Sequence, residues 1–227
     1  RSNPAFLDGS HLRKFDIVLA NPPYSIKEWN REKFMNDKWG RNFLGTPSQG
    51  RADYAFIQHI LASMNDENGR CAILLPHGIL FRNEEKEVRT NLVKSDLLEA
   101  VIGLGPNLFY NAPMEACILF CNKNKDRERK NRITFINAVK EVTRKNAESY
   151  LEQHHIEKIL HAFHSQEDIE QFKLSISTDD IANKDFDLSI QKYVFIKDAE
   201  VEEISFSSAI SRWLNSQKEV HVQYITL

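Results

Sequence analysis

Short continuous apolar runs along the chain alternate with longer stretches in which apolar residues recur at helical spacing. Runs of this kind, bounded by proline, glycine or charged residues, are typical of buried β-strands. They lie at residues 15–20, 70–75, 99–104, 116–121 and 133–138. Helical spacing occupies the intervals 51–64 and 84–95. This alternation predicts an α/β fold with a mostly parallel sheet that is covered on both faces.

Two features of the later sequence depart from this alternation. No helical spacing separates the runs 99–104 and 116–121, so we expect these two strands to pair antiparallel at one edge of the sheet. From residue 139 onward helical spacing predominates, including residues 201–214. We therefore divide the chain into a sheet-containing domain, 1–138, and a mostly helical C-terminal extension, 139–227.

The first apolar run ends in the tetrapeptide Asn21-Pro22-Pro23-Tyr24. In open α/β sheets, ligands bind beyond the carboxyl ends of the strands, which is where this loop would lie. Proline fixes its own φ at about −65° and pushes the preceding residue towards an extended backbone. The loop is therefore expected to be a stiff display of one amide, one aromatic ring and one or two free carbonyl groups.

The displayed groups suit one chemical task, the activation of an exocyclic amine on a nucleobase. Such an amine is a poor nucleophile because its lone pair is delocalised into the ring. The Asn21 side-chain oxygen and the Pro22 carbonyl would bind its two N–H groups and expose that lone pair. The Tyr24 ring offers a face on which a base can stack. Asn21, Pro22, Pro23 and Tyr24 are thus candidate catalytic residues; alternatively the four form only a turn, since asparagine and proline are common there.

Composition narrows the classes of protein. At 227 residues, 41% hydrophobic and 27% charged, the chain is an ordinary globular protein, and its net charge of −2 provides no global field for nucleic acid. No apolar stretch reaches the length of a membrane span and no signal-peptide pattern is present, so we expect a cytoplasmic protein without a membrane partner. Cys71, Cys117 and Cys121 lie in apolar runs and are expected to be reduced and buried. Four histidines between 154 and 164 lack a partner set for zinc, so no metal site is predicted.

Several segments, in order and spacing, resemble the modification subunit of type I restriction–modification systems, an adenine-N6 DNA methyltransferase. The first is residues 15–24, which contain the tetrapeptide. The others are Arg-Ala-Asp-Tyr-Ala-Phe at 51–56, Leu-Leu-Pro-His-Gly-Ile-Leu-Phe at 74–81, the run 99–110, and later landmarks at 154–159 and 187–194. The resemblance covers residues 15–196.

The resemblance implies S-adenosylmethionine as methyl donor and DNA as substrate. It implies as partners a specificity subunit, a restriction subunit and a second modification subunit. The strands from residue 15 onward would be the fourth to seventh of a Rossmann-like sheet, with the seventh inserted antiparallel beside the fifth and sixth. The chain would then be the C-terminal half of that sheet, with the strand 17–20 left as an apolar edge. The Gly-rich donor loop and its acidic partner are absent upstream of residue 21, so the main donor site is expected to be missing and the isolated chain inactive.

Three further site residues come from the same comparison. Phe109 and Tyr110 occupy the loop where relatives place a second aromatic ring against the extruded base, and only one of them is expected to face it. Their alternative role is to anchor the loop in the hydrophobic core. Asp53 opens a helix near the tetrapeptide. A favourable contact with the helix dipole is the interpretation we favour for it, and donor binding together with Asn21 is the alternative. His77 is expected to be structural.

Two other functions remain open at this point. Asn-Pro-Pro-Tyr also occurs in protein-glutamine and RNA methyltransferases. The chain could also be a catalytically inactive piece that only assembles with the other subunits, an interpretation favoured by the missing donor loop. The extension after residue 139 is expected to carry subunit contacts.

Overall fold

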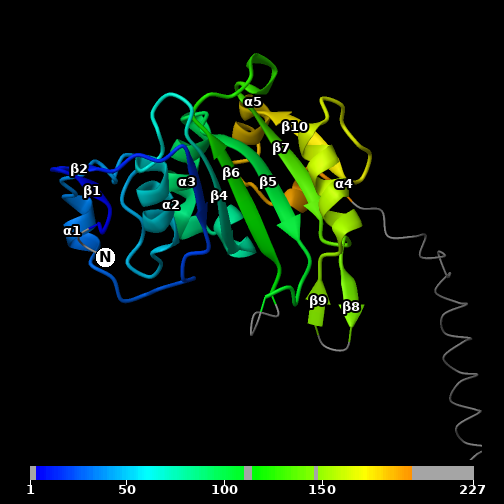
Figure 1. The fold of residues 1–227 in the computed structure, drawn as a ribbon, viewed down its shortest axis with the longest axis horizontal. Coiled ribbons are helices and arrows are strands. Elements are labelled where there is room, and N and C mark those ends of the chain that lie inside the picture. Colours follow the sequence, from blue (N-terminus) through cyan, green and yellow to red (C-terminus); the bar gives the residue numbers. More distant parts are fainter. Residues whose placement is uncertain (1–3, 110–113, 146–147, 196–227) are drawn as a thin grey trace, which may run out of the picture. The chain divides into compact units, whose positions relative to one another are not determined.

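A six-stranded mixed sheet forms the centre of the computed structural model, which describes residues 4–109, 114–145 and 148–195. The strands run in the order β10-β7-β5-β6-β4-β3 (Figure 1). Their bounds are Ile17–Ala20 (β3), Arg70–Pro76 (β4), Leu98–Leu104 (β5), Ala116–Asn122 (β6), Arg132–Ala138 (β7) and Lys173–Ser177 (β10). All five strands expected from the apolar runs are therefore present, and the α/β class is confirmed.

The pairing corrects two expectations. The β3–β4 and β5–β7 pairs are parallel, but β4–β6, β5–β6 and β7–β10 are antiparallel, so the sheet is mixed and not mostly parallel. The hairpin of β5 and β6 forms as expected, yet it lies inside the sheet and not at its edge. The reason is that β6 returns between β4 and β5, while the chain then crosses over to add β7 and β10 beyond β5.

One face of the sheet is covered by two helices, α2 (Asp53–Ala62) and α3 (Lys86–Lys94). Alternate residues of the strands point to this face, because side chains in a strand alternate between the two sides. The helices and strands share one buried cluster with the segment that ends the described chain. Its members include Tyr54, Ile57, Leu61, Ile73, Leu75, Leu92, Cys117, Leu119, Phe135, Leu188 and Ile190.

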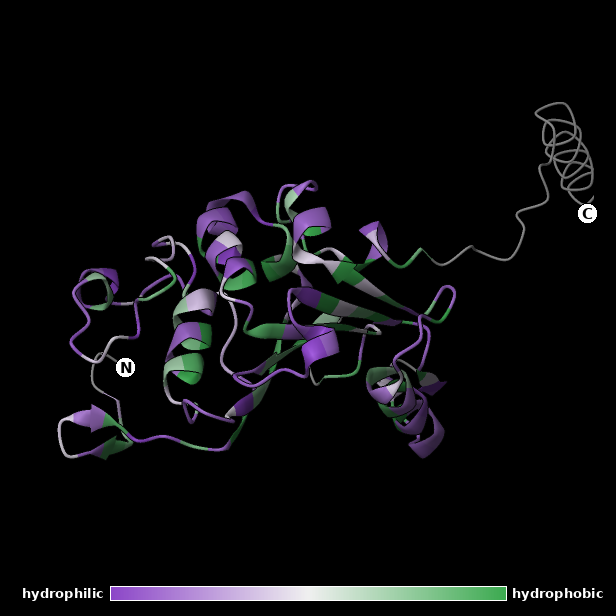
Figure 2. Cartoon of the chain, turned by 90° about the horizontal axis from the view of Figure 1, so that it is seen from above, coloured by the Kyte–Doolittle hydropathy of each residue, from purple (hydrophilic) through white to green (hydrophobic). Residues whose placement is uncertain are grey.

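The opposite face is covered by α4 (Gln153–His164), which packs on β5, β6 and β7. Here Ile102, Leu104 and Ile136 pack with Ala162 of that helix. In Figure 2 the central strands are mostly coloured hydrophobic, while the helices carry both colours, as amphipathic helices do. The remaining elements are α1 (Arg31–Met35), α5 (Thr178–Ala182), the hairpin β1–β2 (Leu7–Asp8, His11–Leu12), the hairpin β8–β9 (Thr143–Lys145, Glu148–Tyr150) and four short 3-10 turns.

Strand β3 lies at one edge of the sheet and bonds only to β4 among the described residues. Its Ile17 and Leu19 side chains are 61% and 78% exposed. The strand was expected to be buried on its apolar pattern, and that is wrong for its outer face; the apolar edge inferred from the resemblance is what the structure has. Val18 and Ala20 point to the other face and pack against the core.

The segment assigned to the C-terminal extension contributes to the sheet, since β10 pairs with β7 along five residues. The domain boundary at 138/139 stays a prediction. The assignment of catalysis to the first part and subunit contacts to the second also stays a prediction. The helix expected at 201–214 lies outside the described residues. Of the four histidines, three are exposed, but His155 is buried because its ring accepts the backbone N–H of Glu152 and caps α4.

Candidate active site

The tetrapeptide directly follows β3, at the edge of the sheet where several strands end. Strands β3, β4, β5 and β7 run in the same direction, so their carboxyl ends share this edge. The loops that begin at Asn21, His77 and Gly105 therefore lie on one side of the molecule. Two strands separate β3 from β5, which puts the third loop roughly 14 Å along the edge from the first at the usual strand spacing.

Asn21 and Tyr24 are in contact. The Tyr24 hydroxyl donates a hydrogen bond of 2.9 Å to the Asn21 side-chain oxygen. Asn21 is exposed, whereas Tyr24 is half-buried. Burial, with smaller contributions from Cys117 and Asp53, raises the pKa of Tyr24 above its ordinary value, so the hydroxyl remains a donor at neutral pH. This bond directs the side-chain oxygen of Asn21 towards the Tyr24 hydroxyl. The oxygen keeps one further lone pair with which it can accept another hydrogen bond.

Asp53, the first residue of α2, binds the backbone immediately after the tetrapeptide. One carboxylate oxygen accepts the N–H of Ser25 at 2.7 Å, and the other lies 3.2 Å from Nη1 of Arg82. The Asp53 side chain is 1% exposed. Ser25 has a φ of 53°, in the left-handed region that residues other than glycine seldom adopt. Both oxygens of this buried carboxylate thus have a partner within the chain.

Arg82 joins two buried carboxylates. Its Nη1 also lies 3.5 Å from the Glu85 side chain, which is fully buried. Burial is the largest cause that raises the pKa of Glu85 to about 7, and Arg82 opposes it. A second arginine, Arg51, donates to the Ser25 hydroxyl at 2.8 Å. Sequence reasoning missed Arg82, Glu85 and Ser25; only the position of Asp53 beside the tetrapeptide hinted at a support for this loop.

Of the two aromatic residues expected to stack on the base, the structure describes only Phe109. Phe109 is partly buried and packs against the core cluster beneath α4. Tyr110 lies outside the described residues. The packing agrees with the anchoring role for Phe109, and base stacking by either residue stays a prediction.

His77 begins the loop after β4. Its Nδ1 lies 3.8 Å from the Glu115 carboxylate, and burial holds the pKa of its ring below the usual value despite that acid. Its Nε2 is buried without a hydrogen-bond partner among the described residues. A mostly neutral imidazole with one buried nitrogen agrees with the structural role expected for it.

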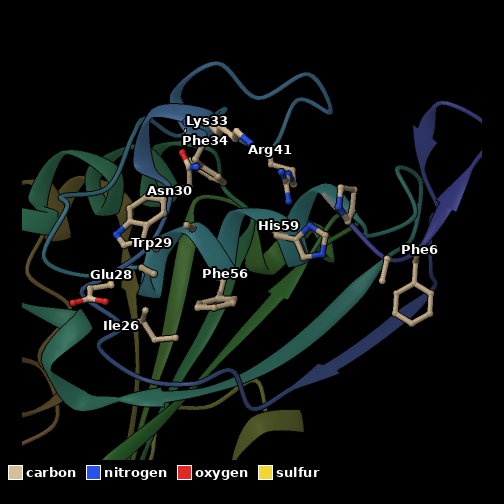
Figure 3. A pocket seen from close by; sticks show the side chains of 14 residues that line it. Phe6, Ile26, Glu28, Trp29, Asn30, Lys33, Phe34, Arg41, Phe56 and His59 are labelled. Atoms are coloured by element: carbon tan, nitrogen blue, oxygen red, sulfur yellow. Dashed lines mark hydrogen bonds between the residues drawn. The ribbon is translucent and has the colours of Figure 1, made fainter. Parts of the chain in front are cut away.

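A separate cavity of about 510 Å³ lies beside α2 (Figure 3). Its walls come from α2, α1, the loop between β3 and α1, and the start of the described chain; they include Phe6, Ile26, Trp29, Phe34, Phe56 and His59. Burial, aided by Arg41, lowers the pKa of His59 to about 4, so the ring is neutral at neutral pH. Asn21 and Tyr24 do not line this cavity.

Two kinds of site are absent from the described part of the chain. No group of three or more histidine, cysteine or acidic side chains is arranged to hold a metal ion there. None of the helices in residues 4–195 combines the length and the apolar character needed to cross a bilayer. The three cysteines are free and buried, as expected from the sequence.

The family model described as N-6 DNA Methylase matches residues 2–202, a range that includes every residue the structure describes. The chain belongs to the N-6 DNA methylase family. Among curated proteins, the chain is 32% identical over 217 residues to the type I restriction enzyme MjaVII methylase subunit of Methanocaldococcus jannaschii, covering 90% of this chain and 36% of that protein. It is 31% identical over 228 residues to the HindI methylase subunit of Haemophilus influenzae, covering 95% of this chain and 50% of that protein. The chain thus spans about a third to a half of these relatives.

Solved structures agree with this N-6 DNA methylase assignment. The type I restriction–modification methyltransferase subunit from Streptococcus thermophilus matches with a TM-score of 0.74 at 36% identity, over 81% of this chain and 39% of that one. The EcoKI M protein matches with a TM-score of 0.60 at 16% identity, over 92% of this chain and 49% of that one, a likeness of fold alone.

Proposed function

We propose that this chain is the catalytic part of a type I modification subunit that transfers a methyl group from S-adenosylmethionine to N6 of adenine in DNA. The relatives above are named as methylase subunits of type I restriction enzymes. The observation that carries the proposal is the exposed Asn21 amide at the carboxyl end of β3, with the Tyr24 ring held beside it.

The chemistry follows from these two residues and Pro22. The donor supplies an electrophilic methyl group. The Asn21 oxygen and the Pro22 carbonyl would accept the two N–H groups of the adenine amine and direct its lone pair outward. Transfer would break the methyl–sulfur bond of the donor, leave a neutral thioether and form the new N–C bond. The amine nitrogen would then be cationic, and the neutral acceptors at its N–H groups would stabilise that charge until one proton passes to water. Tyr24 would hold the extruded base by stacking.

The same proposal assigns the chain to the C-terminal half of the complete sheet. In support, β3, β4, β6 and β5 have the order and direction expected of the fourth, fifth, seventh and sixth strands, and β3 is an edge strand whose Ile17 and Leu19 are exposed on one face of the sheet. The main donor site would then lie on strands beyond β3. In the described chain Asp53, the acidic candidate, is already bonded on both oxygens.

The proposed partners follow from the family. One relative in the solved structures is titled as part of a type I complex assembly. We propose that its partners are a specificity subunit, a restriction subunit and a second modification subunit, and that residues 139–227 make the contacts with them. The proposed location is the cytoplasm, where cellular DNA is the substrate. Protein-glutamine or RNA methylation, and a purely assembling role, are the competing functions.

The test uses the complete modification subunit together with its specificity subunit. Transfer of labelled methyl is measured to duplex DNA, RNA and a glutamine-containing release factor, with Asn21→Ala and the matched control Asn124→Ala. Asn124 is an exposed asparagine in the loop after β6, at the other end of the strands. The proposal predicts label on adenine in DNA only, lost in Asn21→Ala and kept in Asn124→Ala. Label on RNA or protein, or none on any substrate, would replace it with one of the competing functions.

A further inference from the structure

A chain of buried contacts connects the loop at 21–25 to the turn after β4. Ser25 donates its N–H to Asp53, and Asp53 is held from the other side by Arg82. These residues are far apart in sequence, yet only one carboxylate separates the guanidinium of Arg82 from the backbone next to Tyr24. The network therefore acts on the residue that follows the proposed catalytic tetrapeptide.

Arg82 is seated on a glycine. A Cβ atom added at Gly78 would lie 2.4 Å from Nη2, 2.6 Å from Nε and 2.7 Å from Cζ of Arg82. The three nearest heavy atoms all belong to the Arg82 side chain, so a methyl group at this position would displace the guanidinium. The other side of the guanidinium faces Glu85, fully buried, and Asp53. The guanidinium of Arg82 is thus close to Gly78, Glu85 and Asp53, and its side chain is 16% exposed.

The arrangement does more than join two elements. A buried ion network contributes little net stability compared with apolar side chains of similar volume, because desolvation of the charges offsets their attraction. In this network one oxygen of Asp53 accepts a single backbone N–H, that of Ser25. The φ of Ser25 is 53°, which is unfavourable without such a bond. The bond therefore stabilises the turn that the chain makes immediately after Tyr24.

We propose that Arg82, seated on Gly78, is a positioning residue for methyl transfer: it orients Asp53 so that the carboxylate holds Ser25 and, through it, the Asn21–Tyr24 pair. The proposal rests on the proposed function above, because it treats this pair as the catalytic one. Arg82 would not touch the base or the donor. Its effect would be on the rate of transfer and not on the binding of either substrate.

The first experiment needs no activity. Amide hydrogen exchange of Ser25 is measured by NMR in the 227-residue chain, with the amide of Ile73 as a reporter for the core. In Arg82→Gln and Gly78→Ala the Asp53 carboxylate loses the cation that orients it and should release the Ser25 N–H. Exchange at Ser25 should then speed up by on the order of tenfold, while Ile73 is unchanged. Arg82→Lys should recover part of the protection, because one of the two carboxylates keeps a cation.

Lys86→Ala is the matched control, since it removes a cation from the same segment whose partner is the exposed Asp185. It should leave Ser25 as in the unmodified chain. If exchange at Ser25 in Arg82→Gln and Gly78→Ala changes only in step with Ile73, or not at all, Arg82 does not position the loop.

The second experiment measures methyl transfer by the complete subunit. Gly78→Ala and Arg82→Gln should lower kcat by on the order of tenfold with KM for DNA and donor within about twofold, the signature of an effect confined to the transition state. Faster exchange at Ser25 with unchanged kcat would overturn the positioning role. Absence of transfer by the unmodified subunit would overturn the proposed function instead. The exchange experiment would still test whether Arg82 holds the loop at Ser25.

Discussion

Tyr24 offers the sharpest test of the proposed site, because its ring and its hydroxyl have separate tasks. Tyr24→Phe removes only the 2.9 Å bond to Asn21, which for a neutral pair near the surface contributes about 1 kcal/mol, or about fivefold in an equilibrium. Tyr24→Ala also removes the stacking face, worth about 1–3 kcal/mol, a further factor between about 5 and about 150. The two variants should therefore differ clearly, with Tyr24→Phe the milder.

The assay separates base retention from chemistry. A duplex with a fluorescent base analogue at the target position reports extrusion, because the analogue brightens when it leaves the stack and is quenched when it stacks on an aromatic ring. Tyr24→Phe should keep the quenched signal and a single-turnover rate within about fivefold of the unmodified subunit, since it loses about 1 kcal/mol. Tyr24→Ala should lose the quenching and slow transfer further. Because the raised pKa of Tyr24 keeps its hydroxyl protonated, the ratio between the tyrosine and phenylalanine forms should not change with pH near neutrality.

One result would refute this division of tasks. If Tyr24→Phe slows transfer as much as Tyr24→Ala does, the hydroxyl and its bond to Asn21 matter more than the ring. Loss of structure is checked separately: the circular dichroism spectrum of each Tyr24 variant should match that of the unmodified subunit.

Three other outcomes are expected. The pKa of Glu85 is about 7 in the folded chain, above its unfolded value of 4.5. Its contribution to the free energy of unfolding is therefore fully present below pH 4.5 and decreases by about 3 kcal/mol as the pH rises through 7. Denaturant unfolding of Glu85→Gln should not show this decrease. His59, with a pKa lowered to about 4 from 6.5, has the opposite slope in part of that window, so only the difference between the two proteins isolates Glu85, and equal pH profiles would contradict the burial assigned to it. Leu19→Lys should reduce self-association of the chain in analytical ultracentrifugation, because it places a charge on the exposed edge strand β3. No change, or an equal change in the control Lys130→Ala between β6 and β7, would show that the chain does not associate through β3. Isothermal calorimetry should detect no one-to-one binding of S-adenosylmethionine by the 227-residue chain at micromolar concentrations, and such binding would place the donor site within it.

The elements of the sheet and the placement of the candidate site follow from local patterns. Continuous apolar runs located the five strands from β3 to β7, and the double proline after the first of them located the loop that carries Asn21 and Tyr24. Both are short-range properties: a short continuous apolar run favours a β-strand over a helix or loop, and proline restricts its own backbone. The three cysteines were placed in the core by the same argument.

The pairing of strands could not be predicted in the same way. The inner position of the β5–β6 hairpin and the addition of β10 depend on where the chain crosses over, and periodicity within a strand contains no information on its partner. The exposed face of β3 shows the same limit, because apolar residues predict burial but the structure decides whether another element is present to bury them.

The support of the site was likewise decided by tertiary structure alone. Asp53 stands out in the sequence as an acid at the start of a helix, where a contact with the helix dipole explains it. Its actual bonds go to Ser25, 28 residues earlier, and to Arg82, 29 residues later. Electrostatic partners of this kind are set by burial, which makes an unpaired carboxylate costly and so selects whichever cation and N–H the fold brings within reach. The sequence by itself determined which groups are offered to a base, and only the folded chain determined what holds them in place.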